Sequence, residues 1–269
     1  MADDLVADDL WERIAPLLPP RPARRSRFPG RKPIDDRVAL DGILFVLRTN
    51  VSWRDVPAEK IGCSGITCWR RLREWTEAGV WPRLHTLLLS ELRTAKLLDM
   101  DDVAVDGSHV RALKRGAHTG PSPVDRGRPG SKHHVLVDRH GTPLAVTLTG
   151  GNRHDVTQLL PLVEAIPHIR GRRGRPRRRP RRLFADRGYD YDKYRALLHR
   201  HGITPKIARR GVAHGSGLGK VRWVVERTFA WLHQFKRLRV RSEVRADLHQ
   251  GLLELACSII CLRRLRKSF

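Results

Sequence analysis

The hydrophobic pattern of the chain changes near residue 98. Within residues 35–48, apolar side chains recur every three or four positions, the spacing that places them on one face of an α-helix. Past residue 98, the short apolar runs at 103–105 and 183–185 have the length of buried strands. The sequence therefore predicts two regions: an all-helical region over residues 1–98 and an α/β region over residues 99–269.

Turn and cap signals divide each region into elements. In the first region we expect helices at residues 8–14, 35–48, 64–79 and 81–97. In the second we expect, in chain order, a strand at 103–105, a hairpin of strands at 134–138 and 144–148, a helix at 155–166, a strand at 183–185, a helix at 192–201, a strand at 203–208, and helices at 221–235 and 248–265. This order predicts a mixed sheet with helices packed on it.

Charge is distributed unevenly along the chain. The 53 Lys and Arg against 28 Asp and Glu give a net charge of +25, of which +3 falls in residues 1–100 and +22 in residues 101–269. An ordinary metabolic enzyme has no use for such an excess, and the simplest partner for it is nucleic acid. Arginine supplies 43 of the 53 basic residues, a bias that a GC-rich genome also produces. The composition therefore favours nucleic acid without proving it.

The cysteines and the apolar runs indicate a cellular compartment. Cys63, Cys68, Cys257 and Cys261 form no CxxC pair, which favours buried reduced thiols over a four-cysteine zinc site. Reduced thiols are typical of a reducing cytoplasm. The N-terminus has no signal-peptide pattern, and the apolar run at 252–262 is too short to span a bilayer. We expect a cytoplasmic protein with no membrane partner.

Three acidic residues stand where a sheet could gather them. Asp106 follows the predicted strand at 103–105, Asp186 follows the strand at 183–185, and Glu226 lies in the middle of a predicted helix. If the two strands are neighbours, both aspartates project from the same edge of the sheet. Three carboxylates that meet repel one another unless a cation lies between them, and Mg²⁺ prefers such hard oxygen ligands. Two such ions suit phosphodiester chemistry.

Each carboxylate also has an ordinary structural interpretation. An Asp before a glycine at a strand end is typical of a turn or a cap, and Glu226 can form an ion pair with Arg222, four residues earlier. Arg222, Glu226 and His233 nevertheless share a helix face, about 100° from the apolar stripe. That face offers a carboxylate for metal and a guanidinium for phosphate.

Three segments carry a family resemblance: AVDGSHV at 104–110, FADRGYD at 184–190 and RWVVERTFAW at 222–231. Supporting stretches are SWRDVP at 52–57, DRGRPGSKHH at 125–134 and GNRHD at 151–155. Together they resemble the bacterial insertion-sequence transposases with a DDE active site. The resemblance implies an RNase H-like fold from about residue 100 onward. It also implies that Asp106, Asp186 and Glu226 bind two catalytic Mg²⁺ ions, with Mn²⁺ as a substitute.

One signature of that family surrounds the glutamate with Tyr, Arg and Lys at fixed spacing. Arg222 and Glu226 match it, whereas Gly219 stands at the Tyr position and His233 at the Lys position. The departures affect phosphate contacts rather than the metal site. His233 or Lys236, one turn further on, can make the missing contact, and the sequence does not choose between them.

The helical region resembles a DNA reader. Short helices joined by tight turns, with Arg70, Arg71 and Arg73 on one of them, fit a helix-turn-helix-like arrangement that binds DNA ends. The alternative is a helical cap that only packs on the catalytic part.

The most basic stretch is residues 170–182, with nine arginines and no acid. So many like charges do not pack together, which predicts a mobile loop that binds phosphate. Arg173 and Arg175 belong to an RGRP sequence that resembles the core of an AT-hook, which reads the minor groove. Generic phosphate binding and an inert insertion are the alternatives. A second stretch, residues 209–241, has nine basic residues against one acid, Glu226.

These features predict a DNA transposase of the bacterial cytoplasm, associated with the nucleoid. Its partners would be double-stranded DNA, both element ends and target, and a second copy of the chain or a larger assembly that brings two ends together. Two rivals remain at this stage. One is a non-catalytic DNA-binding protein on the same fold, and the other is an RNase H-like nuclease that hydrolyses but does not join.

Overall fold

The N-terminal region is helical, as its periodicity predicts. The computed structural model describes residues 6–21, 26–27, 32–212 and 219–267. The helices of this region are α1 (Asp8–Ile14), the 3-10 turn η1 (Ala15–Leu17), α2 (Asp36–Thr49), η2 (Trp53–Asp55), α3 (Ala58–Ile61), α4 (Gly65–Glu77) and α5 (Val80–Thr94). Side-chain caps explain two of the starts, because Asp35 accepts a hydrogen bond from the backbone N–H of Arg37 and Ser64 accepts one from that of Thr67.

The second region forms a seven-stranded mixed sheet. Its strands are β1 (Asp102–Ala112), β2 (Gly120–Pro121), β3 (Pro129–Asp138), β4 (Pro143–Gly150), β5 (Arg182–Ala185), β6 (Thr204–Ile207) and β7 (Val240–Arg241). The path runs β2-β3-β1-β5-β6, with β4 on β3 and β7 on β1. Strand β3 is antiparallel to β1 and β4, whereas β5 is parallel to β1 and β6.

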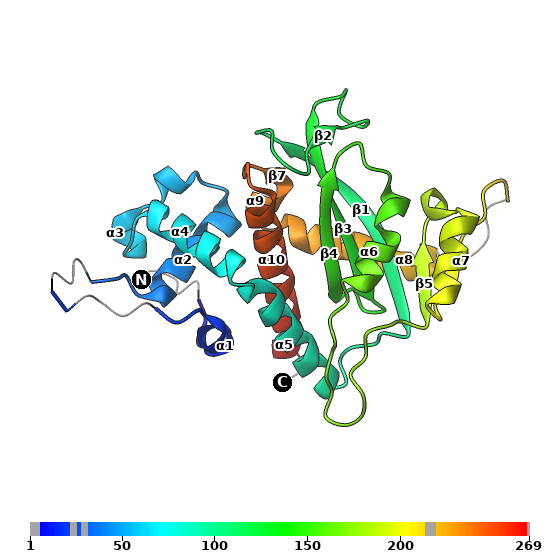
Figure 1. The fold of residues 1–269 in the computed structure, drawn as a ribbon, viewed down its shortest axis with the longest axis horizontal. Coiled ribbons are helices and arrows are strands. Elements are labelled where there is room, and N and C mark those ends of the chain that lie inside the picture. The colour runs from blue at the N-terminus through cyan, green and yellow to red at the C-terminus, as the bar shows by residue number, and fades with distance from the viewer. Residues whose placement is uncertain (1–5, 22–25, 28–31, 213–218, 268–269) are drawn as a thin grey trace.

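Helices cover both faces of this sheet (Figure 1). The turn η3 (Asp155–Gln158) and helix α6 (Leu159–Glu164) lie in front of it, and α7 (Asp192–Arg200) lies beside β5, after the turn η4 (Arg187–Tyr189). Helix α8 (Gly219–His233) crosses behind the sheet, and α9 (Lys236–Arg239) and α10 (Ala246–Arg266) follow it. The predicted α/β fold, a mixed sheet flanked by helices and preceded by a helical region, is confirmed.

The two regions share one hydrophobic core. Helix α10 packs against α5 and α4 on one side and against β4 on the other. The buried cluster runs without interruption from Val6 to Leu265. Polar contacts cross the same boundary, because the His85 imidazole on α5 makes a 2.8 Å hydrogen bond to the Pro143 carbonyl on β4. The long helix α10 therefore ties the N-terminal helices to the sheet.

Several element boundaries differ from the sequence-based prediction, and two of the differences lie close to the site. Asp106 lies inside β1 rather than after its end, because β3 pairs with β1 through Asp106 and Gly107 and up to Arg111. The single helix predicted at 155–166 is a 3-10 turn followed by α6. Starting α6 at Leu159 places Pro161 in the first turn, where proline is tolerated.

The cysteines occupy two separate places. Cys63 and Cys68 lie together in the N-terminal helices, and Cys257 and Cys261 lie on α10; all four are buried and free. Among the described residues, none of the helices is both long and apolar enough to cross a membrane.

Candidate active site and DNA-binding surfaces

Parallel pairing places Asp106 and Asp186 side by side. Strands β1 and β5 pair with a constant offset of 80 residues, as in Ala104 opposite Phe184. The same offset relates Asp106 to Asp186, the residue that directly follows the end of β5. Neighbouring strands lie about 4.8 Å apart, and residues in register on them point to the same face. The two strands are therefore neighbours, which is the condition under which both aspartates project from the same edge of the sheet.

The Asp106 carboxyl is held in a mostly buried position. One oxygen accepts a 2.8 Å hydrogen bond from the backbone N–H of Gly107, and the other lies 3.5 Å from the Arg222 guanidinium. Burial raises the pKa of Asp106 to about 6, and the negative charges of Asp186 and Asp155 act in the same direction. A carboxyl in this state gains from any cation that binds beside it.

Asp186 begins the turn that follows β5. Its carboxylate accepts a 2.8 Å hydrogen bond from the backbone N–H of Gly188, which caps η4. The turn brings in Tyr189, whose buried hydroxyl has no hydrogen-bond partner among the described residues. Burial raises the pKa of Tyr189 well above its usual value, and Asp106, Asp155 and Asp186 raise it further. The hydroxyl therefore stays protonated beside a group of carboxylates.

Helix α8 brings Arg222 and Glu226 to the same side of the sheet. Val225 and Leu232 are fully buried, whereas Glu226 is exposed, so the apolar stripe and the polar face are divided as predicted. Arg222 reaches Asp106, and Glu226 lies one turn further along the helix. Within the described residues, however, no three His, Cys, Asp or Glu side chains are gathered closely enough to hold a metal ion. The structure thus brings Asp106, Asp186 and Arg222 together, whereas Glu226 lies one turn further along α8 and, within the described residues, does not gather with the two aspartates.

A further carboxylate, that of Asp155, lies at the level of Gly107, on the face of β1 opposite to the Asp106 side chain. A Cβ atom added to Gly107 would meet an Asp155 carboxylate oxygen at 2.9 Å, so only glycine allows this approach. The buried Lys132 ammonium donates to that oxygen at 2.9 Å and to the Arg153 carbonyl at 2.8 Å. The His134 ring, 3.7 Å from the same oxygen, completes the cluster, and burial lowers the pKa of His134 to about 4.

Sequence reasoning assigned no role to Asp155, Lys132 or Tyr189. The signal for Asp155 was present, since it ends the GNRHD stretch that supports the family resemblance. Tyr189 likewise lies three residues after Asp186. Their positions around β1 depend on η3 and η4 packing together, which no local pattern indicates.

The two alternatives for the missing phosphate contact lie in different environments. His233 is half-buried, its Nε2 has no hydrogen-bond partner among the described residues, and burial lowers the pKa of its imidazole. Lys236, at the start of α9, is exposed. Lys236 is therefore the better placed of the two to meet a phosphate.

The three arginines of α4 divide into two kinds. Arg70 and Arg73 are exposed, and the Arg73 guanidinium lies over the Trp69 ring at 5.5 Å. Ile66, also exposed, stands one turn earlier on the same face. Arg71 instead forms an ion pair with Asp36 on α2 and another with Glu74 on its own helix. The exposed face of α4 thus offers two of the three predicted arginines.

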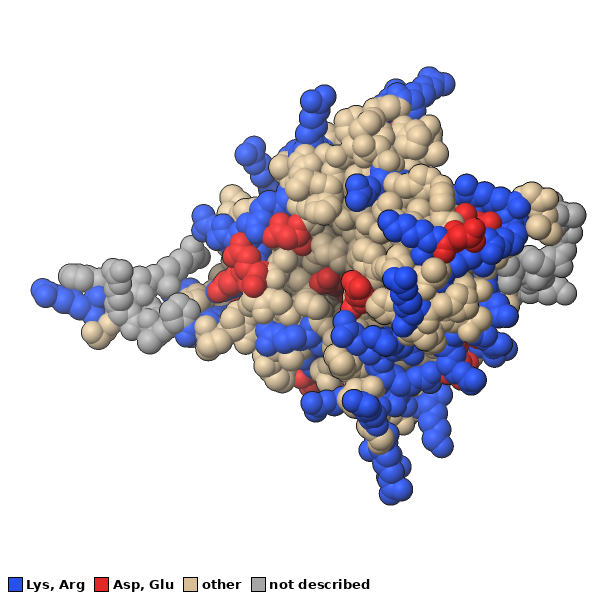
Figure 2. All heavy atoms as spheres, turned by 45° about the vertical axis from the view of Figure 1, so that its right-hand side comes forward, with Lys and Arg blue, Asp and Glu red and all other residues tan. Residues whose placement is uncertain are grey.

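The basic loop at 170–182 is anchored at its base. Arg177 and Arg181 form ion pairs with Asp101, and Arg182 with Asp102. Arg173 and Arg175 are exposed at its tip. Figure 2 shows Lys and Arg side chains spread over the face on the α7 side of the molecule, with the acidic side chains in small groups among them.

Comparison with known proteins identifies related sequences for both regions. The family described as "Transposase DDE domain" matches residues 98–261, and the one described as "Putative transposase of IS4/5 family" matches residues 6–85. A "Putative transposase for insertion sequence element IS402" from Burkholderia cepacia is 61% identical over 150 residues, which cover 56% of this chain and 71% of that protein. An "Insertion element IS402 uncharacterized 16.2 kDa protein" from the same organism is 55% identical over 124 residues, which cover 46% of this chain and 84% of that protein.

Among solved structures, the catalytic domain of Mos1 mariner transposase is similar at 12% identity, over 68% of this chain and 90% of that chain, with a TM-score of 0.27. The sequence match is decisive, because it covers more than half of the chain and includes Asp106, Asp186 and Glu226. The chain belongs to the transposase DDE domain family.

Proposed function

We propose that this DDE-family transposase binds the inverted-repeat ends of its own insertion sequence, cleaves a phosphodiester there to expose a 3′-hydroxyl, and directs that hydroxyl at target DNA. The observation that supports this most is the register of β1 and β5. It sets Asp106 beside Asp186, directly under the helix that carries Arg222 and Glu226. Paired carboxylates next to a guanidinium suit a negatively charged phosphodiester bound through cations.

The donor set fits divalent cations. Asp106, Asp186 and Glu226 would hold two Mg²⁺ ions, or Mn²⁺ in their place, because all three supply hard oxygen ligands. Burial raises the pKa of Asp106 to about 6 despite the Gly107 hydrogen bond and the Arg222 charge, so a cation beside the carboxyl would favour its ionised form. When bound, the ions polarise the scissile phosphate and activate the attacking oxygen. Glu226 lies one turn along α8 from Arg222, and its place among the ligands is part of the proposal.

The surrounding side chains position the substrate and the carboxylates. Arg222 is placed to donate to a phosphate oxygen beside Asp106, a charge-assisted contact that orients the strand. Lys132 holds Asp155 against Gly107 and so supports β1 where Asp106 projects. Tyr189 is no nucleophile, since the burial and the carboxylates that raise its pKa keep the hydroxyl protonated. The proposal therefore includes no covalent protein–DNA intermediate.

The remaining surfaces take supporting roles. Residues 1–98 would bind the element ends, with Arg70 and Arg73 on the exposed face of α4 reaching the DNA. Arg173, Arg175 and Lys236 would contact backbone phosphates, and residues 99–269 would carry out catalysis. Bringing two ends together requires a dimer or larger assembly on DNA, in a cytoplasmic, nucleoid-associated setting.

The test is cleavage of a labelled duplex that contains the element end. Asp106→Asn, Asp186→Asn and Glu226→Gln should each reduce Mg²⁺-dependent cleavage by at least about 10²–10³-fold, the scale of losing one electrostatic catalytic group. Binding of the same duplex should change little. Glu164→Gln, an exposed acid on α6, is the matched control and should cleave normally.

Each outcome discriminates among the candidates. Full cleavage by any of the three carboxylate variants overturns the site. Cut products without joined products from the wild-type chain would identify a hydrolysing nuclease. Specific binding by the wild-type chain with neither product would identify a non-catalytic DNA-binding protein on this fold.

A further inference from the structure

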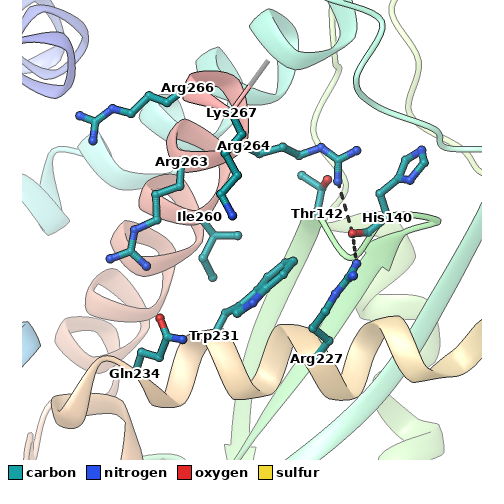
Figure 3. A pocket seen from close by; sticks show the side chains of 10 residues that line it. All are labelled: His140, Thr142, Arg227, Trp231, Gln234, Ile260, Arg263, Arg264, Arg266 and Lys267. Atoms are coloured by element: carbon teal, nitrogen blue, oxygen red, sulfur yellow. Dashed lines mark hydrogen bonds between the residues drawn. The ribbon is translucent and has the colours of Figure 1, made fainter. Parts of the chain in front are cut away.

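A pocket of about 640 Å³ lies away from the carboxylates, on the other side of α8. It is bounded by the turn between β3 and β4, by the second half of α8 and by the C-terminal end of α10 (Figure 3). Five of its ten lining residues are basic and none is acidic: Arg227, Arg263, Arg264, Arg266 and Lys267 carry the charge. The proposed catalytic residues do not line it.

The positive charge of this pocket is only partly compensated. Arg266 forms an ion pair with Asp9, and the carboxylate of Asp138 lies beneath the turn, where backbone N–H groups donate to it. Arg227 and Arg264 both donate to the His140 carbonyl, at 2.6 and 3.3 Å. Their Nε atoms are buried without a hydrogen-bond partner among the described residues. Guanidinium groups that converge in this way attract an anion.

Repulsion between these cations contributes to a lowered pKa at two of them, Arg227 and Arg263. Burial lowers the pKa of Arg227, and the neighbouring Arg264 lowers it further. Burial likewise lowers the pKa of Arg263, with added effects from Arg48 and Arg266. A bound anion would relieve this repulsion.

One wall of the pocket, formed by Arg227, is held rigidly. The Arg227 guanidinium lies between the rings of Trp223 and Trp231, 4.4 and 4.7 Å from their centroids. Cation–π contacts of this kind hold a guanidinium against the aromatic rings. Arg227 therefore presents its charge in a fixed place rather than on a flexible side chain.

Helix α8 lies between this pocket and the two aspartates. Glu226 and Arg227 are consecutive, so their side chains point about 100° apart around the helix. A helix with its side chains is about 10–12 Å across, and a DNA strand advances about 3.4 Å per nucleotide. A strand that passes over α8 from the carboxylates would reach the pocket about three nucleotides away.

We propose that this pocket binds backbone phosphates of the DNA strand that leaves the active site across α8. The proposal rests on the proposed function, that the chain acts on DNA. Arg263, Arg266 and Lys267 are exposed along the last turns of α10. Arg263 and Lys267 are four residues apart, with about 5–6 Å between their Cβ atoms. Cations spread along a rim suit a strand of successive phosphates better than one free phosphate.

The test compares two pairs of substitutions that remove the same charge. Arg263→Ala/Lys267→Ala changes the pocket rim, and Lys193→Ala/Arg200→Ala changes two exposed cations of α7 as the matched control. The probe is a labelled duplex of the element end with flanking DNA, and the dissociation constant is measured against salt concentration. Circular dichroism should show that both variants fold, because all four residues are exposed.

The pocket variant should lower the salt slope by about 2 in absolute value and bind about 10- to 100-fold more weakly at 0.1 M salt. The control should match the wild-type chain. Equal slopes for the pocket variant and the wild type would overturn the proposal. A second result would also overturn the proposal: the pocket binds a deoxynucleoside monophosphate saturably, as followed by Trp231 fluorescence, while the pocket variant keeps the DNA affinity of the wild type. A wild-type chain that fails to bind element ends would instead defeat the proposed function.

Discussion

At the residue scale, Arg237 holds three segments together. Its side chain is only 5% exposed and lies 2.7 Å from the Glu243 carboxylate, which is 3% exposed. It also donates to the Asn50 side chain and the Val51 carbonyl, which follow α2. The Trp53 indole N–H donates to Glu243 from the same loop. A buried ion pair with this many hydrogen bonds is costly to break from one side.

Removing one partner of this pair should unfold the protein more easily. Arg237→Met leaves the Glu243 charge buried and uncompensated, so the free energy of unfolding should fall by about 3–5 kcal/mol, as measured by urea denaturation. The double variant Arg237→Met/Glu243→Gln also removes the charge while keeping an acceptor for Trp53. It should recover most of the loss. Equal losses in both variants would show that packing, not charge, matters here.

His85 gives the protein a defined sensitivity to acid. Burial lowers its pKa to about 4, against 6.5 for an exposed histidine. Because the unfolded chain binds the proton more tightly, this group destabilises the fold progressively as the pH falls from about 6.5 to about 4. The difference between the two pKa values corresponds to about 3 kcal/mol in the free energy of unfolding. Above pH 6.5 the group contributes no pH dependence.

A comparison with His85→Gln isolates this effect. The amide can still donate to the Pro143 carbonyl but does not titrate. Stability measured at pH 7 and at pH 4 should fall by about 3 kcal/mol more in the wild type than in the variant. An identical fall in both proteins would mean that other groups cause the acid sensitivity.

At the element scale, α4 illustrates how packing selects among neighbouring residues. The sequence placed Arg70, Arg71 and Arg73 on one helix, and because a helix turns about 100° per residue, consecutive arginines diverge. Arg70 and Arg73 are exposed, while Arg71 is used in the contact with Asp36 on α2. Only the arrangement of α2 against α4 decides which arginines are available to DNA.

This division predicts different consequences for the three residues. Arg70→Ala/Arg73→Ala should weaken binding of the element end by about tenfold or more, as two phosphate or base contacts are lost. Arg71→Ala should lower the free energy of unfolding by about 1 kcal/mol or less, because the ion pair is partly exposed. It should have little effect on binding of the element end. Fluorescence anisotropy with end and scrambled duplexes measures the binding, and thermal denaturation measures the stability. The opposite ranking would mean that α4 is a packing helix rather than a DNA reader.

Strand β1 shows why element ends are hard to predict. An Asp-Gly pair typically begins a turn, so the strand was expected to stop at Val105. In the structure β3 supplies a continuous antiparallel partner through Gly107, and the missing side chain there leaves room for Asp155. Local turn preference was outweighed by pairing with a distant strand.

At the scale of the whole molecule, the helical and α/β regions share one core through α10. The Gln250 side chain donates to the Val146 carbonyl of β4, while the opposite side of the helix packs on α5. Regions that share a core of this kind unfold together rather than separately. This arrangement would hold the proposed DNA-binding region in fixed relation to the proposed catalytic residues.

Calorimetry should therefore show one unfolding transition for the full chain. The calorimetric and van't Hoff enthalpies should agree, as expected for a cooperative unit. Two resolved transitions would show that residues 1–98 and 99–269 unfold as independent domains. Urea denaturation followed by tryptophan fluorescence and by circular dichroism offers a second check, since both signals should change together.

The sequence by itself determined the chemistry available to this protein. Its periodicity defined the helical and α/β regions, its charge indicated a polyanion, and Asp106, Asp186 and Glu226 carried the family resemblance. These are properties of local spacing and of residue type. The tertiary structure decided what lies beside what: the pairing of β1 with β5, the approach of Asp155 to Gly107, and the basic pocket between α8 and α10. Such contacts join residues far apart in the chain, and only the packing of whole elements determines them.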